Sequence, residues 1–540
     1  MIRSVRFARP FFKHSPFVVS RPAATQLQLR YNSQATEKQH NDAKFHKPTQ
    51  IGDAEAGSQE PSEAADAAAT ILAELRDMQI NPQKATWLEA LKEKEKMQAE
   101  GKRIDSFVYT NPVTTTVGEK TRADSFSYLL LPFKEEPWLC DAYINAFGRL
   151  RAGQLFQDLD ALAGRIAYRH CSPAEPVNVT ASVDRIYMVK KVDEISKFNF
   201  VLAGSVTWTG RSSMEITVKG YAFETDIKEE DITIDSLPAS NVFLTANFTF
   251  VARNPVTHKS FAVNRLLPIT EQDWVDYRRA ESHNAKKKLE AKKMKIIEPT
   301  AEESKVVYNM WRATQSSANV DKVKSANKLS FMKDTKQTST LFMQPQYRNR
   351  HSYMIFGGYL LRQSFELAYC TAASFSLAGP RFVSLDSTNF KSPVPVGSVL
   401  SMYASVSYTE HLHDANETKE VAQENAPFTF QLPAMNKISS NPDAFLSEPG
   451  TIVQVQVDTF IQHLNSNNKK EAGTFIYSFF VPRDSHSESG GVGDELESES
   501  GYCSVVPQTY SEMMTYISGR RRAYDTAQYV ETLPKPDAEE

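Results

Sequence analysis

The sequence lacks long apolar runs, is poor in cysteine, and contains none of the short motifs of the common nucleotide-binding and serine-hydrolase folds. No stretch reaches the ~18 consecutive apolar residues of a membrane-spanning helix. Only 4 cysteines occur among 540 residues, without CxxC spacing, so neither a disulfide framework nor a zinc site is indicated. No GxSxG elbow, Walker loop or dinucleotide fingerprint stands between a strand-like and a helix-like segment. The sequence therefore predicts no membrane span and no metal site, and it disfavours a serine-hydrolase mechanism.

Acidic residues are also missing from residues 1–36, although cations occur throughout this segment. Phenylalanines interleave with the cations, so a transient helix would show an apolar face and a basic face. This composition is typical of a mitochondrial transit peptide, and we predict import into the mitochondrial matrix. A disordered basic tail is the alternative. The whole chain carries a net charge of -3, which gives no reason to expect nucleic acid as a partner.

The remainder of the chain divides into two similar globular units with linkers around them. Residues 37–104 combine a polar linker with two amphipathic helical patterns. Residues 105–270 contain the helix-like stretch "GRLRAGQLFQDLDALAGRIAYRHC", then four strand-like runs with alternating polarity, which indicate an antiparallel sheet. Residues 321–483 show the same order. Residues 271–320 predict a charged linker helix, and residues 484–540 predict an acidic flexible tail with a short final helix.

Matches between the two units indicate an internal duplication. Gly153 aligns with Gly358 at an offset of 205, and Ser182 aligns with Ser384 at an offset of 202. The last strands, "NFTFVAR" and "YSFFVPR", match at an offset of 230 because the second unit carries an insertion. A drifting offset with matches in constant order is typical of a diverged duplication.

Three stretches of the sequence resemble a known family. They are "RADSFSYLLLPFKEEPWLCDAYINAFGRLRAGQLFQDLDALAG", "RNRHSYMIFGGYLLRQSFELAYCTAASF" and "VSLDSTNFKSPVPVGSVLSMYASVSYTE". Over about residues 105–482, the chain resembles the mitochondrial acyl-coenzyme A thioesterases with two hotdog domains, of the acyl-CoA thioesterase 9 type. The resemblance implies an α+β fold, a tandem hotdog in which each antiparallel sheet wraps a long central helix. It also implies hydrolysis of acyl-CoA to fatty acid and coenzyme A, without metal or redox cofactor, at the junction of the two halves.

The carboxylate of such a site is expected on the central helix. In the family it stands seven residues after the second glycine, which makes Asp160 the candidate. Asp160 would activate water or attack the thioester carbonyl. Its apolar neighbours Leu159 and Leu162 would desolvate it and raise its pKa toward that of a useful base. The alternative is that Asp158 and Asp160 are solvated acids on the first turns of a helix, favoured there by the dipole.

The polar partner of this acid is expected before the glycines of the other half, where the family has an asparagine. Arg350 occupies that position, flanked by Asn349 and His351, so either the loop has gained one residue and Asn349 acts, or His351 has taken the role. A histidine in a loop is also commonly a structural hydrogen-bonding residue. The reciprocal set would form a second site and consists of Asn145, Gly153 and Glu366. Phe365 stands at the acid position there, which favours a less active or structural role.

Gly358 and three arginines complete the expected site. Without a Cβ, Gly358 lets a thioester carbonyl approach the unpaired N–H groups at a helix start. An oxyanion would be stabilised there by ~3 kcal/mol per donor. Close packing of the helix against the sheet is the structural alternative. A coenzyme A phosphate could be bound by Arg348, Arg350 and Arg381, and a solvated loop charge is the alternative for each.

Two other functions stay open at this point. A hydratase or dehydratase acting on thioester-linked acyl chains would pair His351 with an acid for proton transfer. A catalytically inactive hotdog scaffold or binding protein would keep the fold and no chemistry. The resemblance implies acyl-CoA as the small-molecule partner, and a homo-oligomer, a trimer of double-hotdog chains, as the assembly.

Overall fold

The computed structural model describes residues 117–531 with the exception of several internal segments. These segments are 256, 291–296, 326–327, 350–353, 387, 414–433, 441–443, 466 and 484–500. The described residues belong to one of the two compact units of the chain, Ala73–Glu540. The transit peptide predicted at 1–36 and the helices predicted within 37–104 lie outside the described residues.

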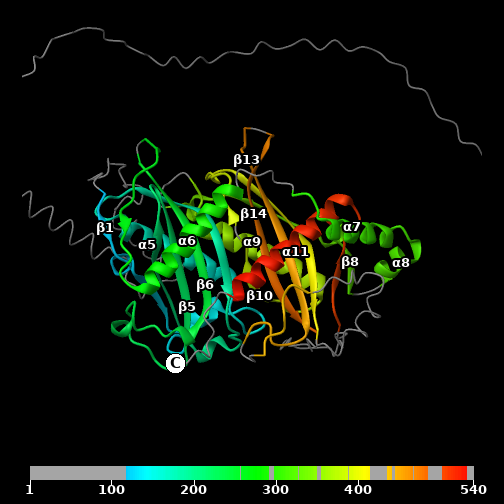
Figure 1. Cartoon of the computed structure of the whole chain (residues 1–540), viewed down its shortest axis with the longest axis horizontal. Helices are drawn as coiled ribbons and strands as arrows, with labels where there is room; N and C mark the ends of the chain where they lie inside the picture. The colour runs from blue at the N-terminus through cyan, green and yellow to red at the C-terminus, as the bar shows by residue number, and fades with distance from the viewer. Residues whose placement is uncertain are drawn as a thin grey trace, which may run out of the picture. The chain divides into compact units, whose positions relative to one another are not determined.

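In the first repeat, a long helix lies against an antiparallel sheet (Figure 1). The helix is α5, Ala152–Cys171, and its buried residues, among them Leu155, Leu159 and Leu162, recur at three- and four-residue spacing. The strands are β2 (Ser127–Leu131), β3 (Val177–Met188), β4 (Asn199–Thr209), β5 (Ser213–Phe223) and β6 (Val242–Arg253). They are ordered β2-β4-β5-β6-β3 across the sheet. Shorter elements beside them are β1 (Glu119–Lys120), α3 (Arg122–Ser125), α4 (Pro137–Tyr143) and β7 (Arg265–Leu266).

The second repeat has the same arrangement. Its helix is α9, Gly357–Ser376. Its strands are β9 (Gln337–Phe342), β10 (Arg381–Leu385), β12 (Val399–Leu412), β13 (Gly450–Gln462) and β14 (Lys469–Pro482), with β11 (Thr388–Asn389) as a short addition. The order β9-β12-β13-β14-β10 corresponds strand by strand to that of the first repeat. The α+β tandem hotdog expected from the sequence is therefore confirmed.

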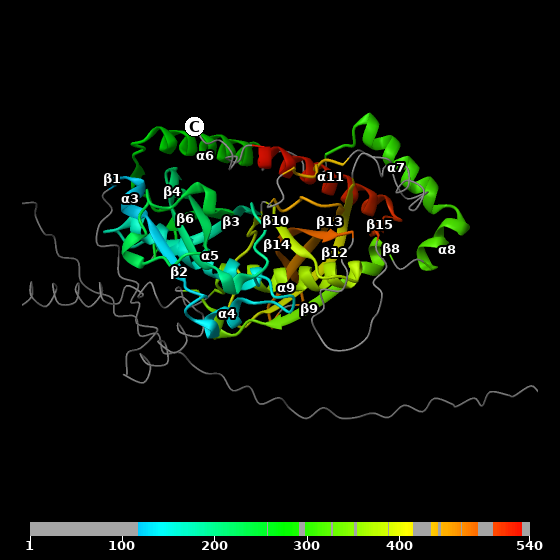
Figure 2. The same cartoon turned by 90° about the horizontal axis from the view of Figure 1, so that it is seen from below.

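The two repeats share one sheet because β3 and β10 are hydrogen-bonded neighbours, which gives a sheet of 11 strands. Ser384 pairs with Tyr187, while its repeat counterpart Ser182 pairs with Asn389. This reciprocal register means that an approximate twofold axis relates the repeats. Helices α5 and α9 lie side by side on one face of the sheet (Figure 2). The starts of both helices therefore lie at the junction of the repeats.

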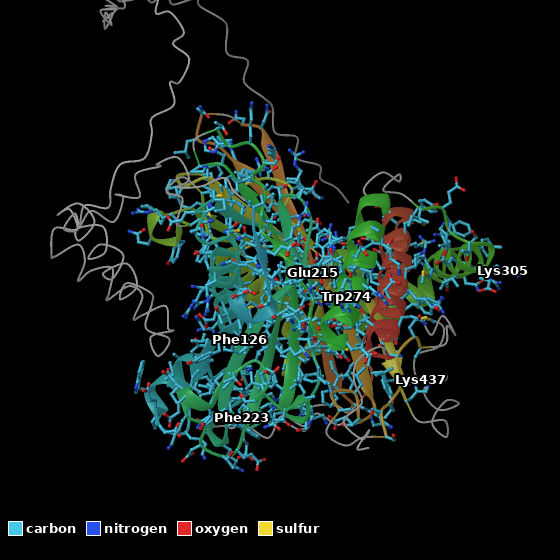
Figure 3. All side chains as sticks on the ribbon, turned by 60° about the vertical axis from the view of Figure 1, so that its left-hand side comes forward. Phe126, Glu215, Phe223, Trp274, Lys305 and Lys437 are labelled. Carbon is cyan, nitrogen blue, oxygen red and sulfur yellow. The ribbon has the colours of Figure 1, made fainter. Side chains whose placement is uncertain are left out.

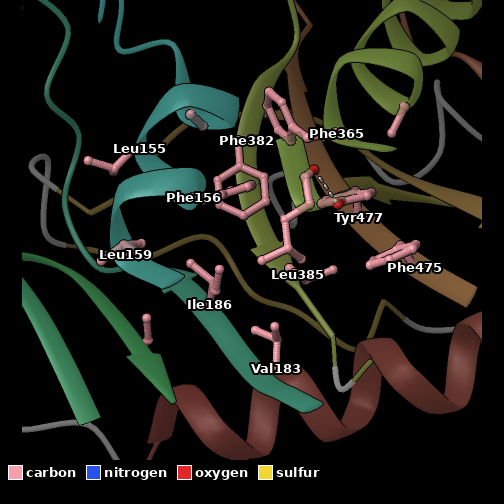
Figure 4. Close-up of a cluster of buried hydrophobic side chains, with 14 of the residues drawn as sticks. Leu155, Phe156, Leu159, Val183, Ile186, Phe365, Phe382, Leu385, Phe475 and Tyr477 are labelled. Atoms are coloured by element: carbon pink, nitrogen blue, oxygen red, sulfur yellow. Dashed lines mark hydrogen bonds between the residues drawn. The ribbon is translucent and has the colours of Figure 1, made fainter. Parts of the chain in front are cut away.

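Aromatic side chains fill the core at this junction. The Phe156 ring on α5 contacts Phe365 on α9 and Phe382 on β10, with ring centroids 5.1 and 5.0 Å away. Both contacts are edge-to-face, the geometry that aromatic quadrupoles favour. Figure 4 shows these three rings between the two helices, with Tyr477 beside them. Residues of both repeats thus build one continuous core.

Further helices lie on the opposite face of the sheet. They are α6 (Glu271–Glu290) and α11 (Tyr510–Glu531), and beside them lie α7 (Ala301–Thr314), α8 (Ser317–Ser325) and the parallel strand pair β8 (Leu329–Phe331) and β15 (Ser504–Val506). Figure 2 shows α6 and α11 in line along this face. The described residues between the repeats thus form three helices where a single charged linker helix was expected, and the final helix, 22 residues long, is not short. No helix among the described residues is long and apolar enough to cross a membrane.

Buried acids on the sheet hold α6 in place, so this helix is more than a solvated linker. Glu215 on β5 is fully buried and accepts hydrogen bonds from Arg279 at 3.2 Å and from Asn284 at 3.0 Å. Figure 3 labels Glu215 where the sheet meets this helix. Asp184 on β3 forms an ion pair with Lys287 of α6.

Candidate active site at the junction of the repeats

Asp160 is a buried acid on the third turn of α5. Its side chain is 1% exposed, and its Oδ1 accepts a hydrogen bond of 2.9 Å from the Thr180 hydroxyl on β3. Burial raises the pKa of Asp160 to about 6, while the Thr180 hydroxyl and the main-chain N–H of Gly358 limit the increase by favouring the carboxylate. The other carboxylate oxygen, Oδ2, has no hydrogen-bond partner among the described residues. The alternative of a solvated acid on the first turns is therefore wrong for Asp160.

The start of α9 lies directly against this carboxyl group. A Cβ on Gly357 would stand 3.0 Å from Oδ2 of Asp160 and 3.5 Å from Oγ1 of Thr180. The preceding residue, Phe356, provides no side-chain cap for the first N–H groups of the helix. An acid of one repeat therefore meets the uncapped, electropositive helix start of the other.

The two glycines have different surroundings. A Cβ on Gly358 would stand 2.9 Å from the main-chain oxygen of Gln157 and 2.6 Å from the Phe356 ring. Gly358 thus permits the close approach of α9 to α5, so the close packing considered from the sequence is against the other helix and not against the sheet. Gly357, which the sequence did not single out as a site residue, is the glycine whose Cα faces the acid.

The loops before the two helices explain the displaced asparagine. In the first repeat Ile144 bridges to Leu150, six residues later, whereas in the second Arg348 bridges to Ile355, seven residues later. The second loop therefore contains one additional residue. The N–H of Asn145 donates to Arg149, four residues on, and the N–H of Asn349 donates to Met354, five residues on. Asn349 is consequently the positional counterpart of Asn145, and the expected roles of Asn349 and His351 stay predictions.

Other members of the expected set have separate positions. Arg350 and His351 lie outside the described residues, so their expected roles stay predictions. Arg348 lies at the base of the loop before α9. The Asn145 side chain accepts hydrogen bonds from the N–H groups of Phe147 and Arg149 at 2.9 and 3.0 Å. In this structure the Asn145 amide oxygen therefore holds its own loop together.

The start of α5 presents apolar residues in place of the acid and its hydroxyl partner. A Cβ on Gly153 would stand 3.0 Å from the Phe365 ring. Phe365 is the residue of the second repeat that corresponds to Asp160. Phe382 takes the position that corresponds to Thr180, since Ser384 corresponds to Ser182. The Glu366 carboxylate also reaches this helix start, with Oε1 3.2 Å from the same Cβ point, but it forms an ion pair of 2.8 Å with Arg151. The second constellation thus lacks a carboxylate with the surroundings of Asp160.

Arg381 lies at this second helix start rather than with Asp160. It lines a cavity of about 340 Å³ together with Asn145, Arg149, Arg151 and Glu366. Of the three arginines expected to bind phosphate, the structure therefore separates Arg381 from Arg348.

Reasoning from the sequence missed Thr180 and the local environment of Asp158. Thr180 lies on a strand, 20 residues after the acid, and no local motif marks it as a hydrogen-bond donor to Asp160. Asp158 is buried as well, and burial raises its pKa to about 7, against the effect of hydrogen bonds from Tyr143 and Gln154. The Tyr143–Asp158 hydrogen bond measures 2.5 Å. Asp158 is thus hydrogen-bonded within its own repeat, and Arg362 of α9 adds a favourable charge to it.

One group of side chains among the described residues has the composition of a metal site. Candidate ligand atoms of Asp184, Glu215 and His283 all lie within 4.8 Å of one another. Lys287 and Arg279 already form ion pairs with the two acids. These cations balance the charge that a metal ion would need, so the group fits better as an anchor for α6.

No family model matches the sequence. Curated relatives connect the chain to the acyl-CoA thioesterases as a class. The chain is 33% identical over 304 residues to acyl-coenzyme A thioesterase 4, mitochondrial, of Humulus lupulus, with 55% of this chain and 55% of that protein covered. It is 25% identical over 409 residues to acyl-coenzyme A thioesterase 9, mitochondrial, of Mus musculus, with 74% of this chain and 77% of that protein covered. The chain thus spans about half the length of the Humulus relative. The resemblance expected from the sequence is confirmed by these relatives.

Solved structures related to the chain include an acyl-CoA hydrolase of Staphylococcus aureus in complex with butyryl coenzyme A, coenzyme A and coenzyme A disulfide. It is 20% identical, with a TM-score of 0.26, and the match covers 32% of this chain and 90% of that chain.

Proposed function

We propose that this chain hydrolyses acyl-CoA thioesters to a fatty acid and free coenzyme A. The observation that carries the proposal is the position of Asp160, buried on one repeat and directed at the helix start of the other. The thioesterase names of the relatives support the choice of substrate class. An ordinary structural acid would instead be paired with a cation, left in water, or hydrogen-bonded within its own repeat as Asp158 is.

Asp160 supplies the base in this proposal. As a carboxylate it accepts a proton from water while the water oxygen bonds to the thioester carbonyl carbon. The carbonyl oxygen gains negative charge, which the N–H groups at the start of α9 stabilise. Cleavage of the carbon–sulfur bond then gives the fatty acid, and the proton passes to the coenzyme A thiolate. Direct attack by the carboxylate, followed by hydrolysis of the anhydride, would give the same products.

Asn349 is the proposed polar partner of the acid. It is half-buried, and its main-chain N–H donates a 2.7 Å hydrogen bond to Met354, which fixes it in the loop before α9. Its equivalence to Asn145 in the other repeat supports this choice over Arg350. The amide side chain would orient the attacking water or the thioester oxygen.

Thiol release from a panel of acyl-CoAs tests the proposed activity. Release of one thiol for each fatty acid formed is expected for at least one chain length. An absence of thiol release with every chain length would contradict the proposal. Hydration of an enoyl-CoA without thiol release would support the hydratase alternative.

The proposed location is the mitochondrial matrix, because the relatives are named mitochondrial and residues 1–36 have the composition of a transit peptide. Protease protection in fractionated mitochondria would test it. The proposed assembly is a trimer of double hotdogs, and light scattering on the purified chain would test that proposal separately.

A further inference from the structure

The cavity at the start of α5 has an apolar wall and a basic rim. Its volume is about 340 Å³, within the usual range of small-molecule clefts. Phe365, Phe382 and Phe445 contribute apolar surface. The rim includes Arg149, Arg151 and Arg381 together with the acids Asp193 and Glu366. A ligand that combines anionic groups with an apolar arm would match both parts.

The approximate twofold axis relates this cavity to the proposed active site. The corresponding helix starts are Gly153 and Gly358, and the corresponding loops begin at Asn145 and Asn349. What differs is the reacting pair: Asp160 and Thr180 are replaced by phenylalanines. The framework of a binding site is therefore kept, whereas the carboxylate at this helix start, Glu366, is already paired with Arg151.

The rim arginines are paired with acids that a ligand phosphate would have to displace: Arg381 contacts Glu448 at 3.3 Å, and Arg151 contacts Glu366 at 2.8 Å. Arg149 and Arg381 both approach Asp193, at 3.6 and 3.8 Å, and the Asp193 side chain is half exposed. Burial, and next the neighbouring Arg381, lower the pKa of Arg149, while Asp193, Tyr369 and Glu448 raise it. A phosphate between the two guanidinium groups would take the place of Asp193 and accept hydrogen bonds from both.

A buried hydroxyl adds a further donor. The Tyr369 hydroxyl has no hydrogen-bond partner among the described residues, and Tyr369 lines the same cavity. Burial raises the pKa of Tyr369 to about 12, so the hydroxyl keeps its proton. A polar group of the pantetheine arm would satisfy it.

We propose that this cavity, defined by the α5 start and its three arginines, binds coenzyme A or its thioesters without hydrolysing them. The inference rests on the proposed function, since it assigns to the second helix start the same ligand class as to the first. Phosphates contact the arginines, and the pantetheine arm lies along the phenylalanines. The chain then holds two coenzyme A sites, of which one carries out chemistry.

Calorimetric titration of the full chain with coenzyme A counts the coenzyme A sites. Coenzyme A is the product of the reaction and is therefore a stable probe. Two molecules bound per chain are expected. Ala146 is exposed and lines the cavity. Ala146→Trp therefore fills the cavity from its rim and should reduce the binding to one coenzyme A per chain. Leu464→Trp is the control, because it adds the same indole at a position that is 74% exposed, in the turn between β13 and β14. This variant should still bind two molecules of coenzyme A per chain.

A second variant keeps the test independent of folding. Arg151→Gln retains a polar side chain and should weaken one of the two binding events at least tenfold, while leaving the other unchanged. One coenzyme A per wild-type chain, or two in Ala146→Trp, would overturn the second site. Binding of decanoate but not of coenzyme A at the cavity would overturn the ligand class. Thiol release, measured on the same sample, distinguishes these results from failure of the proposed function, because an active chain with one site refutes only the second site.

Discussion

The carboxyl group of Asp160 lies against Gly357, with Oδ2 3.0 Å from the point that a Cβ on Gly357 would occupy. Asp160 belongs to the helix of the first repeat, and Gly357 begins the helix of the second. This contact exists only because the repeats share one sheet through β3 and β10. A single repeat would therefore hold either the acid or the helix start that faces it.

The proposed base predicts the pH dependence of the reaction. Burial raises the pKa of Asp160 to about 6, so kcat/KM should increase with pH and reach half of its plateau at about pH 6. The same shift has the opposite effect on folding. Because the folded chain retains the proton above the ordinary pKa of 3.8, the contribution of Asp160 to stability decreases as pH rises from about 4 to 6. A pH–rate profile that is flat between about pH 5 and 7 would contradict this assignment.

Thr180→Val should move that profile to higher pH. The Thr180 hydroxyl donates to the carboxylate at 2.9 Å and so favours its ionised form. Without it, the pKa of Asp160 should increase by roughly one unit, and the midpoint of kcat/KM should follow. Thr180→Ser restores a hydroxyl and should return the midpoint toward the wild-type value. A lower rate with an unchanged midpoint in Thr180→Val would show that Thr180 acts only in packing.

Alanine at the two glycines should separate catalysis from packing. Gly357→Ala places its Cβ beside Asp160 and Thr180, so thiol release should decrease about tenfold or more while the melting temperature stays close to wild type. Gly358→Ala meets the main-chain oxygen of Gln157 at 2.9 Å and should destabilise the fold by about 1–3 kcal/mol. Denaturant unfolding and kinetics on both variants test the distinction. Equal losses of stability in the two would contradict it.

Lys287→Met should destabilise the chain because it leaves a buried acid without its cation. Asp184 is 1% exposed at its side chain, and Lys287 is its ion-pair partner from α6. Breaking such a pair costs about 3 kcal/mol or more. The double variant with Asp184→Asn should recover part of that loss, and the coupling energy is measured by denaturant unfolding of the four proteins. Additive effects would show that the ion pair does not hold α6.

Hydrophobic periodicity and the duplication predicted two units of helix and antiparallel sheet, and the family resemblance identified these units as hotdogs. The stripe of Leu155, Leu159 and Leu162 is a local pattern, and the alternating strands are another, so both can be read without tertiary information. The helix that follows the first repeat was harder to predict. Its lysines and arginines look like those of a solvated helix until Asp184 and Glu215, which lie far away in the sequence, are known to face it.

The site was predicted in part. Asp160 became the candidate through the family resemblance, because that family places its carboxylate seven residues after the second glycine, whereas Thr180 and Gly357 depend on how three elements approach one another in space. The register of the loop before α9 also needed the structure, because one additional residue shifts Asn349 from the expected position. Arg381 lies at the other helix start, where the fold brings β10 to the first repeat and not to Asp160.

The central claim is that Asp160 is the base for thioester hydrolysis. Asp160→Asn keeps the size of the side chain and removes its basicity, so kcat/KM for thiol release should decrease about 10²–10⁴-fold. Asp158→Asn is the matched control, since Asp158 is a buried acid of the same helix that is bonded to Tyr143, and its loss of activity should be far smaller. The decisive measurement is thiol release by both variants on the best substrate at a pH above 7. A large loss in Asp160→Asn alone is predicted, and wild-type rates in Asp160→Asn would contradict the account.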